Sequence, residues 1–245
     1  MLAIIGGSGL SRLVTLDDIE RRVVRTPYGD PSGALSFGSI GGRELVFLAR
    51  HGEDHSIAPH EVNYRANIRA LQDSGVKEIV AIATVGGIRR EFGPGALVLP
   101  DQIIDYTWGR ASTFFEGEGT KVTHVDFTEP YSAALRSRIL RAAKACGEVV
   151  AKRGVYAATQ GPRLETAAEI NRLERDGADL VGMTGMPEAV LAREAGLAYA
   201  AIAVVANHAA GRGESIHAIS LERIEAVVEQ AMVRVRRIVS QLVAA

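Results

Sequence analysis

The stretch Tyr156-Ala-Ala-Thr-Gln-Gly-Pro-Arg-Leu-Glu-Thr-Ala-Ala-Glu169 passes from a strand-like to a helix-like pattern, and it decides the class of fold. Its apolar beginning predicts a short strand, and Gly161-Pro162 predicts a turn. Thr166 and Glu169 are three residues apart and match a capping box, so a helix should begin at Ala167. A strand, a turn and a helix in succession are typical of α/β proteins.

A second apolar strand, Asp179 to Val181, follows this helix and ends in Met183 and Thr184. Pro187 stands where the first turn of another helix would start. Glu165 therefore follows one strand, while a thioether and a hydroxyl follow the next. Such side chains favour a ligand cleft at the ends of sheet strands, although two ordinary strand-to-helix connections would give the same pattern.

The rest of the chain continues the alternation of strands and helices. Apolar runs predict strands at Leu2–Ile5, Ala34–Phe37, Glu44–Leu48, Glu78–Thr84, Leu97–Leu99 and Leu197–Val205. Helical spacing of apolar residues predicts helices at Asn63–Ser74, Ser132–Ala145, Ala189–Ala195 and from Leu221 onward. No repeat or linker interrupts the series, so we expect one α/β domain over residues 1–245.

Composition limits the classes of function. The 245 residues are 47% hydrophobic, which is enough for a full core. Lys and Arg number 28 against 29 Asp and Glu, and this balance does not favour nucleic acid as a partner. Cys146 is the only cysteine, which excludes a disulfide framework and fits a reducing cytoplasm. The chain shows neither a signal-peptide pattern nor an apolar run of membrane-spanning length, so no membrane partner is expected.

The first strand runs into a glycine-rich turn, Gly6-Gly7-Ser8-Gly9. Such a turn exposes backbone N–H groups and the Ser8 hydroxyl, which suit a phosphate group. It is not a dinucleotide fingerprint, because Arg12 occupies the place of the third glycine. The alternative is a plain tight turn with no ligand.

Another strand delivers Arg50 and His51, with His55 four residues further on. Histidines at this spacing occur in helical zinc sites, but Gly52 and Pro59 argue against the continuous helix that such a site needs. We therefore expect no metal here. A guanidinium beside an imidazole suits an oxyanion better, and a solvated loop is the alternative.

Two further features concern loops. Thr84-Val85-Gly86-Gly87 predicts a second flexible turn at a strand end. The segment from Asp101 to Asp126 is polar, aromatic and irregular, and it contains Trp108. So long an irregular segment is usually a functional or interface loop. Its aromatic residues suit a core, a lid or a subunit contact equally well.

Together these pieces resemble the trimeric purine nucleoside phosphorylase and methylthioadenosine phosphorylase family. The resemblance covers nearly the whole chain, and its motifs are specific in their order and spacing. They are Ile5-Gly6-Gly7-Ser8-Gly9-Leu10, Leu48-Ala49-Arg50-His51-Gly52, Asn63-Tyr64-Arg65-Ala66-Asn67, Gly161-Pro162-Arg163, and Gly182-Met183-Thr184 followed by Pro187-Glu188. The family fold is a single-domain mixed central β-sheet, a distorted barrel, flanked by α-helices.

The resemblance implies phosphorolysis of a purine nucleoside, with phosphate as co-substrate and no cofactor or metal. It implies that phosphate is held by Ser8, Arg50, His51, Thr84 and Thr184. It implies that Met183 lies against the ribose and that Glu165 and Asn207 face the base, with catalytic roles for His51, Glu165 and Asn207. Further substrate contacts are expected from Ala209, Leu221, Ile224 and His55. One departure is Ala83, where relatives often carry a hydroxyl or amide, so the role of this turn rests on Thr84.

The resemblance also implies a homotrimer. Part of the long loop, around Phe114, Phe115 and His124, would reach the site of a neighbouring subunit. The two rival functions are a nucleosidase, in which water replaces phosphate, and a nucleoside sensor without catalysis. Phosphate dependence and turnover separate them.

The residue types fit this chemistry independently. The leaving purine gains negative charge while the sugar becomes cation-like, so a donor such as the Asn207 amide binds the transition state better than the ground state. An ionised Glu165 only accepts hydrogen bonds, and a 6-oxopurine offers the proton on N1 whereas adenine does not. Adenine-specific relatives resemble this chain but carry Ser in place of Glu165 and Asp in place of Asn207.

The 5' end of the sugar gives the second part of the substrate prediction. Leu221 stands where purine nucleoside phosphorylases place a histidine that holds the 5'-hydroxyl, and Ile224 lies one turn on. An apolar lining favours a methylthio group, although both residues also fit the core stripe of the last helix. The expected substrate is 5'-methylthioinosine. Inosine or guanosine is the first alternative, and methylthioadenosine is the second.

Overall fold

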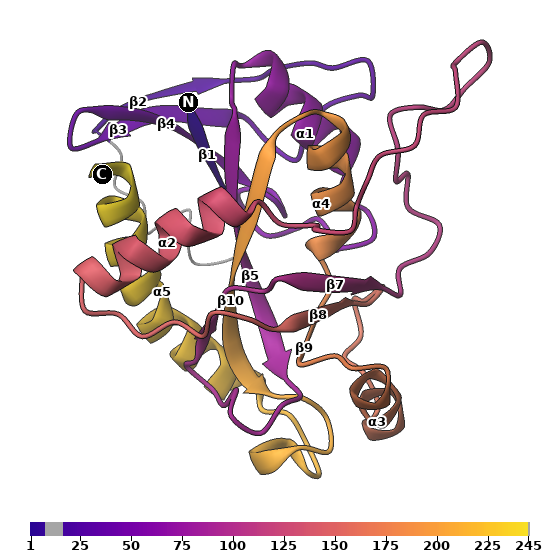
Figure 1. The fold of residues 1–245 in the computed structure, drawn as a ribbon, viewed down its shortest axis with the longest axis vertical. Coiled ribbons are helices and arrows are strands. Elements are labelled where there is room, and N and C mark those ends of the chain that lie inside the picture. Colours follow the sequence, from indigo (N-terminus) through magenta and orange to yellow (C-terminus); the bar gives the residue numbers. More distant parts are fainter. Residues whose placement is uncertain (8–16, 245) are drawn as a thin grey trace.

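The computed structural model describes residues 1–7 and 17–244 (Figure 1). In these residues ten strands join into one mixed sheet. The main order is β2 (Asp17–Arg22), β3 (Leu35–Ile40), β4 (Arg43–Ala49), β1 (Leu2–Gly6), β5 (Glu78–Gly87), β9 (Leu180–Gly182), β8 (Val155–Ala158) and β7 (Gln102–Asp105). β10 (Ala198–His208) also pairs with β5, and β6 (Leu97–Val98) pairs with β10. The predicted mixed α/β fold is confirmed.

The two long strands β5 and β10 form the centre of the molecule. They run parallel from the pair Ala198 and Glu78 to the pair His208 and Gly87. Both are almost wholly buried, as expected for continuous apolar strands covered on both faces. β1 is parallel to β4 and to β5, whereas β9 runs antiparallel to the far end of β5. The carboxyl ends of β1, β4 and β8 are thereby brought beside the middle and far end of β5.

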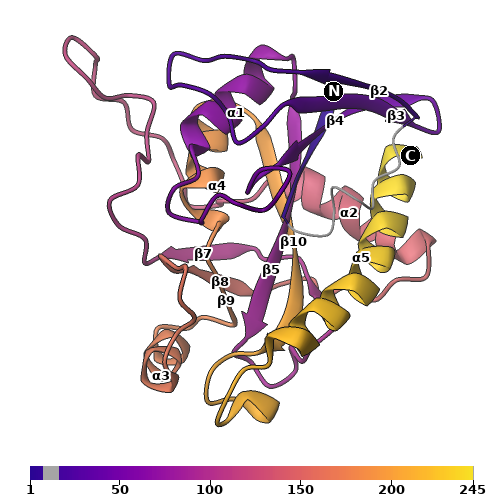
Figure 2. The ribbon, with the colours of Figure 1, turned by 180° about the vertical axis from the view of Figure 1, so that it is seen from behind.

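Helices cover both faces of this centre. α2 (Ala133–Ala145) and α5 (Leu221–Ala244) pack on one side of β5 and β10, and α1 (Tyr64–Asp73) and α4 (Gly185–Glu194) pack on the other (Figures 1 and 2). α3 (Ala167–Arg175) lies beside the ends of β8 and β9, and a 3-10 turn, η1 (Gly213–Ser215), follows β10. Among the described residues, no helix combines the length and apolar character needed to cross a membrane.

The helix starts agree with the sequence. The side chains of Asn63, Ser132 and Thr166 each accept a hydrogen bond from a backbone N–H of the first helical turn. Thr166 and Glu169 form the predicted capping box before α3. These caps satisfy N–H groups that have no partner within the helix.

The strands differ from the prediction in three places. The flexible turn predicted at Thr84–Gly87 is wrong, because β5 continues through these residues while paired with β10. The predicted irregular segment contains β7, which pairs with β8. β2 was missed because its sequence, Asp-Asp-Ile-Glu-Arg-Arg, lacks an apolar face and pairs only as the outermost strand.

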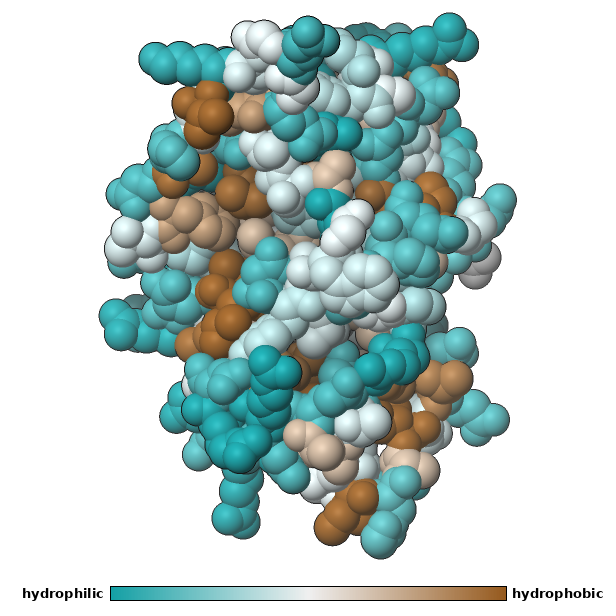
Figure 3. Space-filling model, turned by 90° about the vertical axis from the view of Figure 1, so that its right-hand side faces the viewer, coloured by the Kyte–Doolittle hydropathy of each residue, from teal (hydrophilic) through white to brown (hydrophobic). Residues whose placement is uncertain are grey.

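The long segment, defined as residues 106–132 between β7 and α2, leaves the body of the molecule and returns (Figure 1). It is anchored at Glu194, whose carboxylate accepts from the Thr113 hydroxyl at 2.8 Å and from the Phe114 N–H at 2.7 Å. Trp108 and Val122 on this segment are each 72% exposed. The face seen in Figure 3 is mostly hydrophilic, with separate apolar patches.

Candidate active site

The polar residues expected to bind ligand lie where β1, β4 and β5 run side by side. Gly6, the last residue of β1, pairs with Ala49, the last residue of β4. Arg50 follows at once, and its N–H donates to the Gly6 carbonyl at 2.9 Å. Its side-chain Nη1 donates to the Ile82 carbonyl in β5 at 3.0 Å. Arg50 is therefore held where β1 and β4 end, beside the middle of β5.

Arg50 is fixed by a buried ion pair that the sequence did not predict. Its Nε and Nη2 donate to the two carboxylate oxygens of Glu188 at 2.6 and 2.8 Å, and the Tyr199 hydroxyl donates to the same carboxylate at 2.8 Å. Arg50 is 1% and Glu188 0% exposed. Burial alone would lower the pKa of the guanidinium, but the charge and hydrogen bonds of Glu188 outweigh it and raise that pKa.

This arrangement leaves part of the guanidinium free for a ligand. A guanidinium has five N–H groups, and within the described residues three of those of Arg50 bind Glu188 and Ile82. One N–H remains on each terminal nitrogen. Arg50 thus presents a rigid guanidinium with two N–H donors to spare, as an oxyanion site requires.

His51 has a different electrostatic state from its neighbour. Its Nδ1 lies 2.8 Å from the carbonyl oxygen of Ile57, which can only accept, so Nδ1 carries the proton. Burial, and then the charge of Arg50, lower the pKa of this imidazole from 6.5 to about 4. The ring is therefore neutral near pH 7 and presents Nε2 as an acceptor. His51 was expected to bind phosphate. Through Nε2 the neutral ring can accept a hydrogen bond from a phosphate oxygen that carries a proton.

Gly7, just after β1, lies beside this imidazole. A Cβ built on Gly7 would stand 3.8 Å from Cδ2 of His51. The His51 ring also faces that of His55, with centroids 4.6 Å apart. Ser8, which was expected to bind phosphate, lies outside the described residues.

Thr84 is the one exposed residue in the otherwise buried strand β5. β9 runs antiparallel to the end of β5, with Val181 opposite Gly86, so the residues after β9 run back along β5 toward Thr84. These residues are Met183 and Thr184. Thr184 is buried and immediately precedes α4, the helix that carries Glu188. Of the predicted phosphate residues, Arg50 and His51 follow β4, Thr184 follows β9, and Thr84 lies within β5.

Glu165 is held from β8. The Thr159 hydroxyl donates to its Oε1 at 2.7 Å, and the Thr159 N–H donates to the Gly182 carbonyl of β9 at 2.8 Å. A Cβ on Gly161 would stand 2.4 Å from the Met183 sulfur, so the turn after β8 packs directly on Met183. Glu165 is thus bound to the residue that follows β8, and Met183 packs on the turn that follows it.

Asn207 lies in β10, opposite Gly86 of β5, just after an irregularity in the strand register. Its side-chain amide donates to the His208 carbonyl at 2.7 Å. Ala209 is buried, with its Cα 3.4 Å from a Cβ built on Gly86. Asn207 also borders a cavity of about 330 Å³ whose other lining residues include His208, Ser220, Arg223 and Val227.

The predicted 5' residues lie on the first turns of α5 but do not line this cavity. Leu221 is 67% exposed, and Ile224 is half-buried. Their role in holding the sugar stays a prediction. No cluster of three potential metal ligands occurs in residues 1–7 and 17–244.

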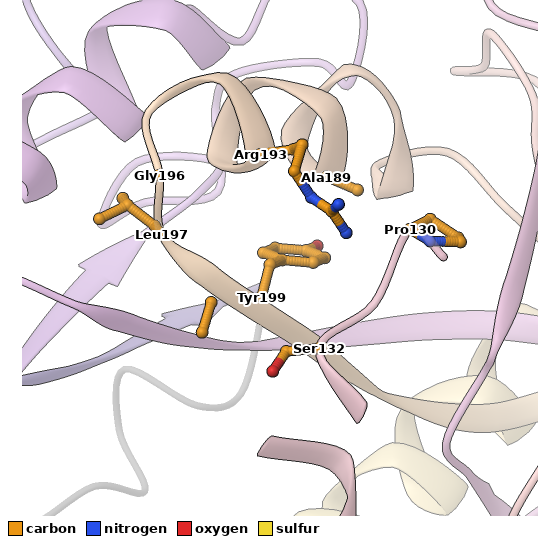
Figure 4. Close-up of a pocket in the computed structure, with 8 residues that line it drawn as sticks. Pro130, Ser132, Ala189, Arg193, Gly196, Leu197 and Tyr199 are labelled. Carbon is orange, nitrogen blue, oxygen red and sulfur yellow. The ribbon is translucent and has the colours of Figure 1, made fainter. Parts of the chain in front are cut away.

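A second cavity, also of about 330 Å³, lies at the opposite end of β10 (Figure 4). Arg193 and Tyr199 point into it, and Pro130 and Ser132 close one side. None of the predicted site residues lines it. Of the two cavities, the one at the Asn207 end of β10 is the one that a predicted site residue lines.

Comparison with known proteins agrees with this geometry. A family model described as the phosphorylase superfamily matches residues 1–244. A Xanthomonas campestris protein named probable S-methyl-5'-thioinosine phosphorylase is 58% identical over 214 residues, which are 87% of this chain and 86% of that protein. A Thermococcus kodakarensis protein named probable 6-oxopurine nucleoside phosphorylase is 47% identical over 215 residues, which are 86% of this chain and 80% of that protein. A solved methylthioadenosine phosphorylase from Schistosoma mansoni in complex with adenine has a TM-score of 0.94 and 34% identity, and the match covers 99% of this chain and 90% of that one.

Proposed function

The chain belongs to the phosphorylase superfamily, and on that premise we propose that it cleaves S-methyl-5'-thioinosine with phosphate. A phosphate oxygen attacks C1' of the sugar, and the bond from C1' to N9 of the purine breaks with its electron pair going to the base. The products are 5-methylthioribose 1-phosphate and hypoxanthine, which takes up one proton. The enzyme is a pentosyltransferase, and the motif resemblance is confirmed at the level of the family.

One observation carries the choice of base. The Thr159 hydroxyl fixes Oε1 of Glu165, which leaves Oε2 of the carboxylate as a further acceptor. A 6-oxopurine donates its N1 proton to such an acceptor, whereas adenine presents a lone pair to it. A mismatched polar group in a site of this kind can cost roughly 10⁴-fold in selectivity. The amide of Asn207 is the matching donor for the charge that develops on the departing base.

Phosphate binding is assigned to residues that follow β4 and β9 and to Thr84 within β5. Arg50 supplies guanidinium N–H donors, and Thr84 and Thr184 supply hydroxyl groups. His51 accepts a hydrogen bond from the phosphate, and Ser8 completes the set on the strength of the motif alone. Holding phosphate below C1' supplies the orientation of attack, and its charge stabilises the cation-like sugar. Neither a covalent nucleophile nor a cofactor is needed.

Further proposals concern the assembly, the location, the domain organisation and a second candidate function. A homotrimer is supported by the family resemblance and by exposed apolar side chains on the long segment, such as Trp108 and Val122. The cytoplasmic location and the reading of residues 1–245 as one catalytic domain rest on the sequence. A general 6-oxopurine nucleoside phosphorylase is the second candidate, because a relative with 47% identity bears that name and Glu165 would serve either substrate.

The deciding experiment measures kcat/KM for methylthioinosine, inosine and methylthioadenosine, each with saturating phosphate and with none. We expect turnover only with phosphate, and the highest kcat/KM for methylthioinosine. Turnover without phosphate would identify a nucleosidase. Preference for inosine would refute the methylthio assignment alone, and preference for methylthioadenosine would refute the argument from Glu165 and Asn207.

A further inference from the structure

Arg110, in the long segment, ties together the ends of two neighbouring strands. Its Nη2 donates to the Gln160 carbonyl at 2.8 Å and to the Thr159 carbonyl at 3.3 Å, both just after β8. Its Nη1 donates to the Met183 carbonyl at 2.8 Å and to the Met186 carbonyl at 2.6 Å, both just after β9. One planar group therefore bridges the two segments that carry the site.

The remaining contacts of the Arg110 side chain are with Gln160 and Tyr64. Nε donates to the side-chain oxygen of Gln160 at 3.2 Å, and Nη1 also reaches the Tyr64 hydroxyl at 3.3 Å. The guanidinium lies over the Tyr64 ring, 5.5 Å from its centroid. All of these acceptors are neutral, and none of the ion pairs among the described residues includes Arg110. Arg50, by contrast, is neutralised by a carboxylate.

A cation satisfied by carbonyl oxygens at fixed angles holds those carbonyls in place. Thr159 is one of the residues held, and its hydroxyl orients Glu165. Met183 is another, and Thr184 follows it. Arg110 thus sets the distance between the groups assigned to the base and the groups assigned to sugar and phosphate.

We propose that Arg110 is a positioning residue of the reaction, and that it maintains the preference for 6-oxopurines by holding Thr159 and hence Glu165. This inference rests on the proposed function. Attachment of the long segment does not explain the contacts, because Glu194 anchors that segment separately through Thr113 and Phe114. The bonds of Arg110 go instead to the backbone of the site.

The test compares Arg110→Ala with wild type on methylthioinosine and methylthioadenosine. Displacement of reacting groups by about 1 Å can cost roughly 10²-fold, and we expect a loss of that order in kcat/KM for methylthioinosine. Methylthioadenosine makes no use of the Glu165 acceptor, so its kcat/KM should fall less. The ratio of the two values should therefore drop by about tenfold or more. Guanidinium chloride at a concentration that does not denature the protein should restore part of the ratio in this variant.

Three further variants make the result specific. Arg136→Ala also removes an arginine that donates to main-chain carbonyls, those of Leu99 and Lys152, but at a distance from the site, and it should leave the ratio within twofold of wild type. Thr113→Val weakens the anchor of the long segment and should also leave the ratio within twofold of wild type. Thr159→Val keeps Arg110 and cuts the bond to Glu165, so it should reproduce the fall in the ratio.

A folded Arg110→Ala protein with an unchanged ratio would overturn the inference, whatever its total activity. If that variant does not fold, Arg110→Lys decides, because an ammonium cannot span both strand ends and should give an intermediate ratio. A wild-type ratio in Arg110→Lys would also overturn the inference. Absence of phosphorolysis by the wild-type protein would refute the proposed function instead, so the two failures are distinct.

Discussion

At the scale of single residues, two neighbours in the chain show how environment decides charge. Arg50 keeps its charge because Glu188 compensates it in a fully buried position. His51, next in the chain, loses its charge because burial and the nearby guanidinium both disfavour the imidazolium. A fixed cation beside a neutral acceptor suits a phosphate that still carries a proton.

This state of His51 predicts how stability depends on pH. The pKa is about 4 in the folded protein and near its ordinary 6.5 when unfolded, so between these values the unfolded chain binds more protons. The contribution of neutral His51 to the free energy of unfolding is complete above pH 6.5. It is lost as the pH falls toward 4, which lowers the free energy of unfolding by roughly 2–3 kcal/mol. Urea unfolding in phosphate-free buffer, at one protein concentration, measures it from pH 7.5 down to 4.

His51→Gln removes this group and should have a flatter curve of unfolding free energy against pH. Other carboxylates titrate in both proteins, so the difference between the two curves isolates His51. Parallel curves over the whole range would show that the folded protein does not depress the pKa of this histidine.

The sequence pointed to candidate site residues but not to the partners that hold them. Arg50, Glu165 and Asn207 stand next to recognisable turns or strand ends. Glu188 is separated from Arg50 by 138 positions, and one sequence holds no information on which distant residues meet. The only local signal was a carboxylate set among apolar residues, which also occurs at ordinary helix starts. The roles of Thr159 and Arg110 depend on main-chain acceptors, which no side-chain pattern reveals.

At the scale of elements, helices were predicted well because their caps are local. The capping box before α3 needs only Thr166 and Glu169, both visible in the sequence. The end of β5 was predicted wrongly because Gly86 and Gly87 were interpreted as a turn. In the structure they belong to a strand, and they are glycines because neighbouring atoms come very close.

Gly87→Ala tests whether the close approach of neighbouring atoms requires a glycine at this position of β5. A Cβ at Gly87 would stand 1.9 Å from the Phe92 carbonyl oxygen, and a backbone atom cannot move away cheaply. We expect the variant to lose at least about 1–3 kcal/mol of unfolding free energy, as other overpacked cores do, or to be insoluble. Denaturation in urea provides the measurement.

Gly33→Ala is the matched control, because a Cβ there meets nothing within 4 Å and its backbone is not left-handed. Its stability should change by less than about 0.5 kcal/mol or rise slightly. Equal stability of the two variants would mean that the end of β5 is loose enough to accept a side chain.

At the scale of the whole molecule, the fold class followed from the sequence but the branching of the sheet did not. Successive strands and helices predict an α/β protein, yet β9 pairs antiparallel with β5 only at the pair Gly86 and Val181 and the pair Gly87 and Leu180. So short a pairing leaves no mark on hydrophobic periodicity. It is nevertheless what brings Met183 and Thr184 toward Thr84.

The proposed assembly is tested by light scattering, which should give about three times the chain mass of 26.1 kDa. Val122→Asp places a charge on the long segment and should shift the protein toward smaller species, because burying an unpaired charge in a contact is costly. Val149 is also highly exposed but lies outside the long segment, and Val149→Asp should leave the mass unchanged. A fully active wild-type monomer in dilute solution would refute a shared site.

The exposed Trp108 gives the long segment an optical signal. It is the only tryptophan in the chain, and its backbone N–H donates to the Gln160 side chain, which also binds Arg110. Fluorescence excited at the indole band therefore comes from one place, between the outer surface and the two strand ends of the site. Emission wavelength and quenching by iodide can thus follow this segment during substrate binding or subunit association without any added dye.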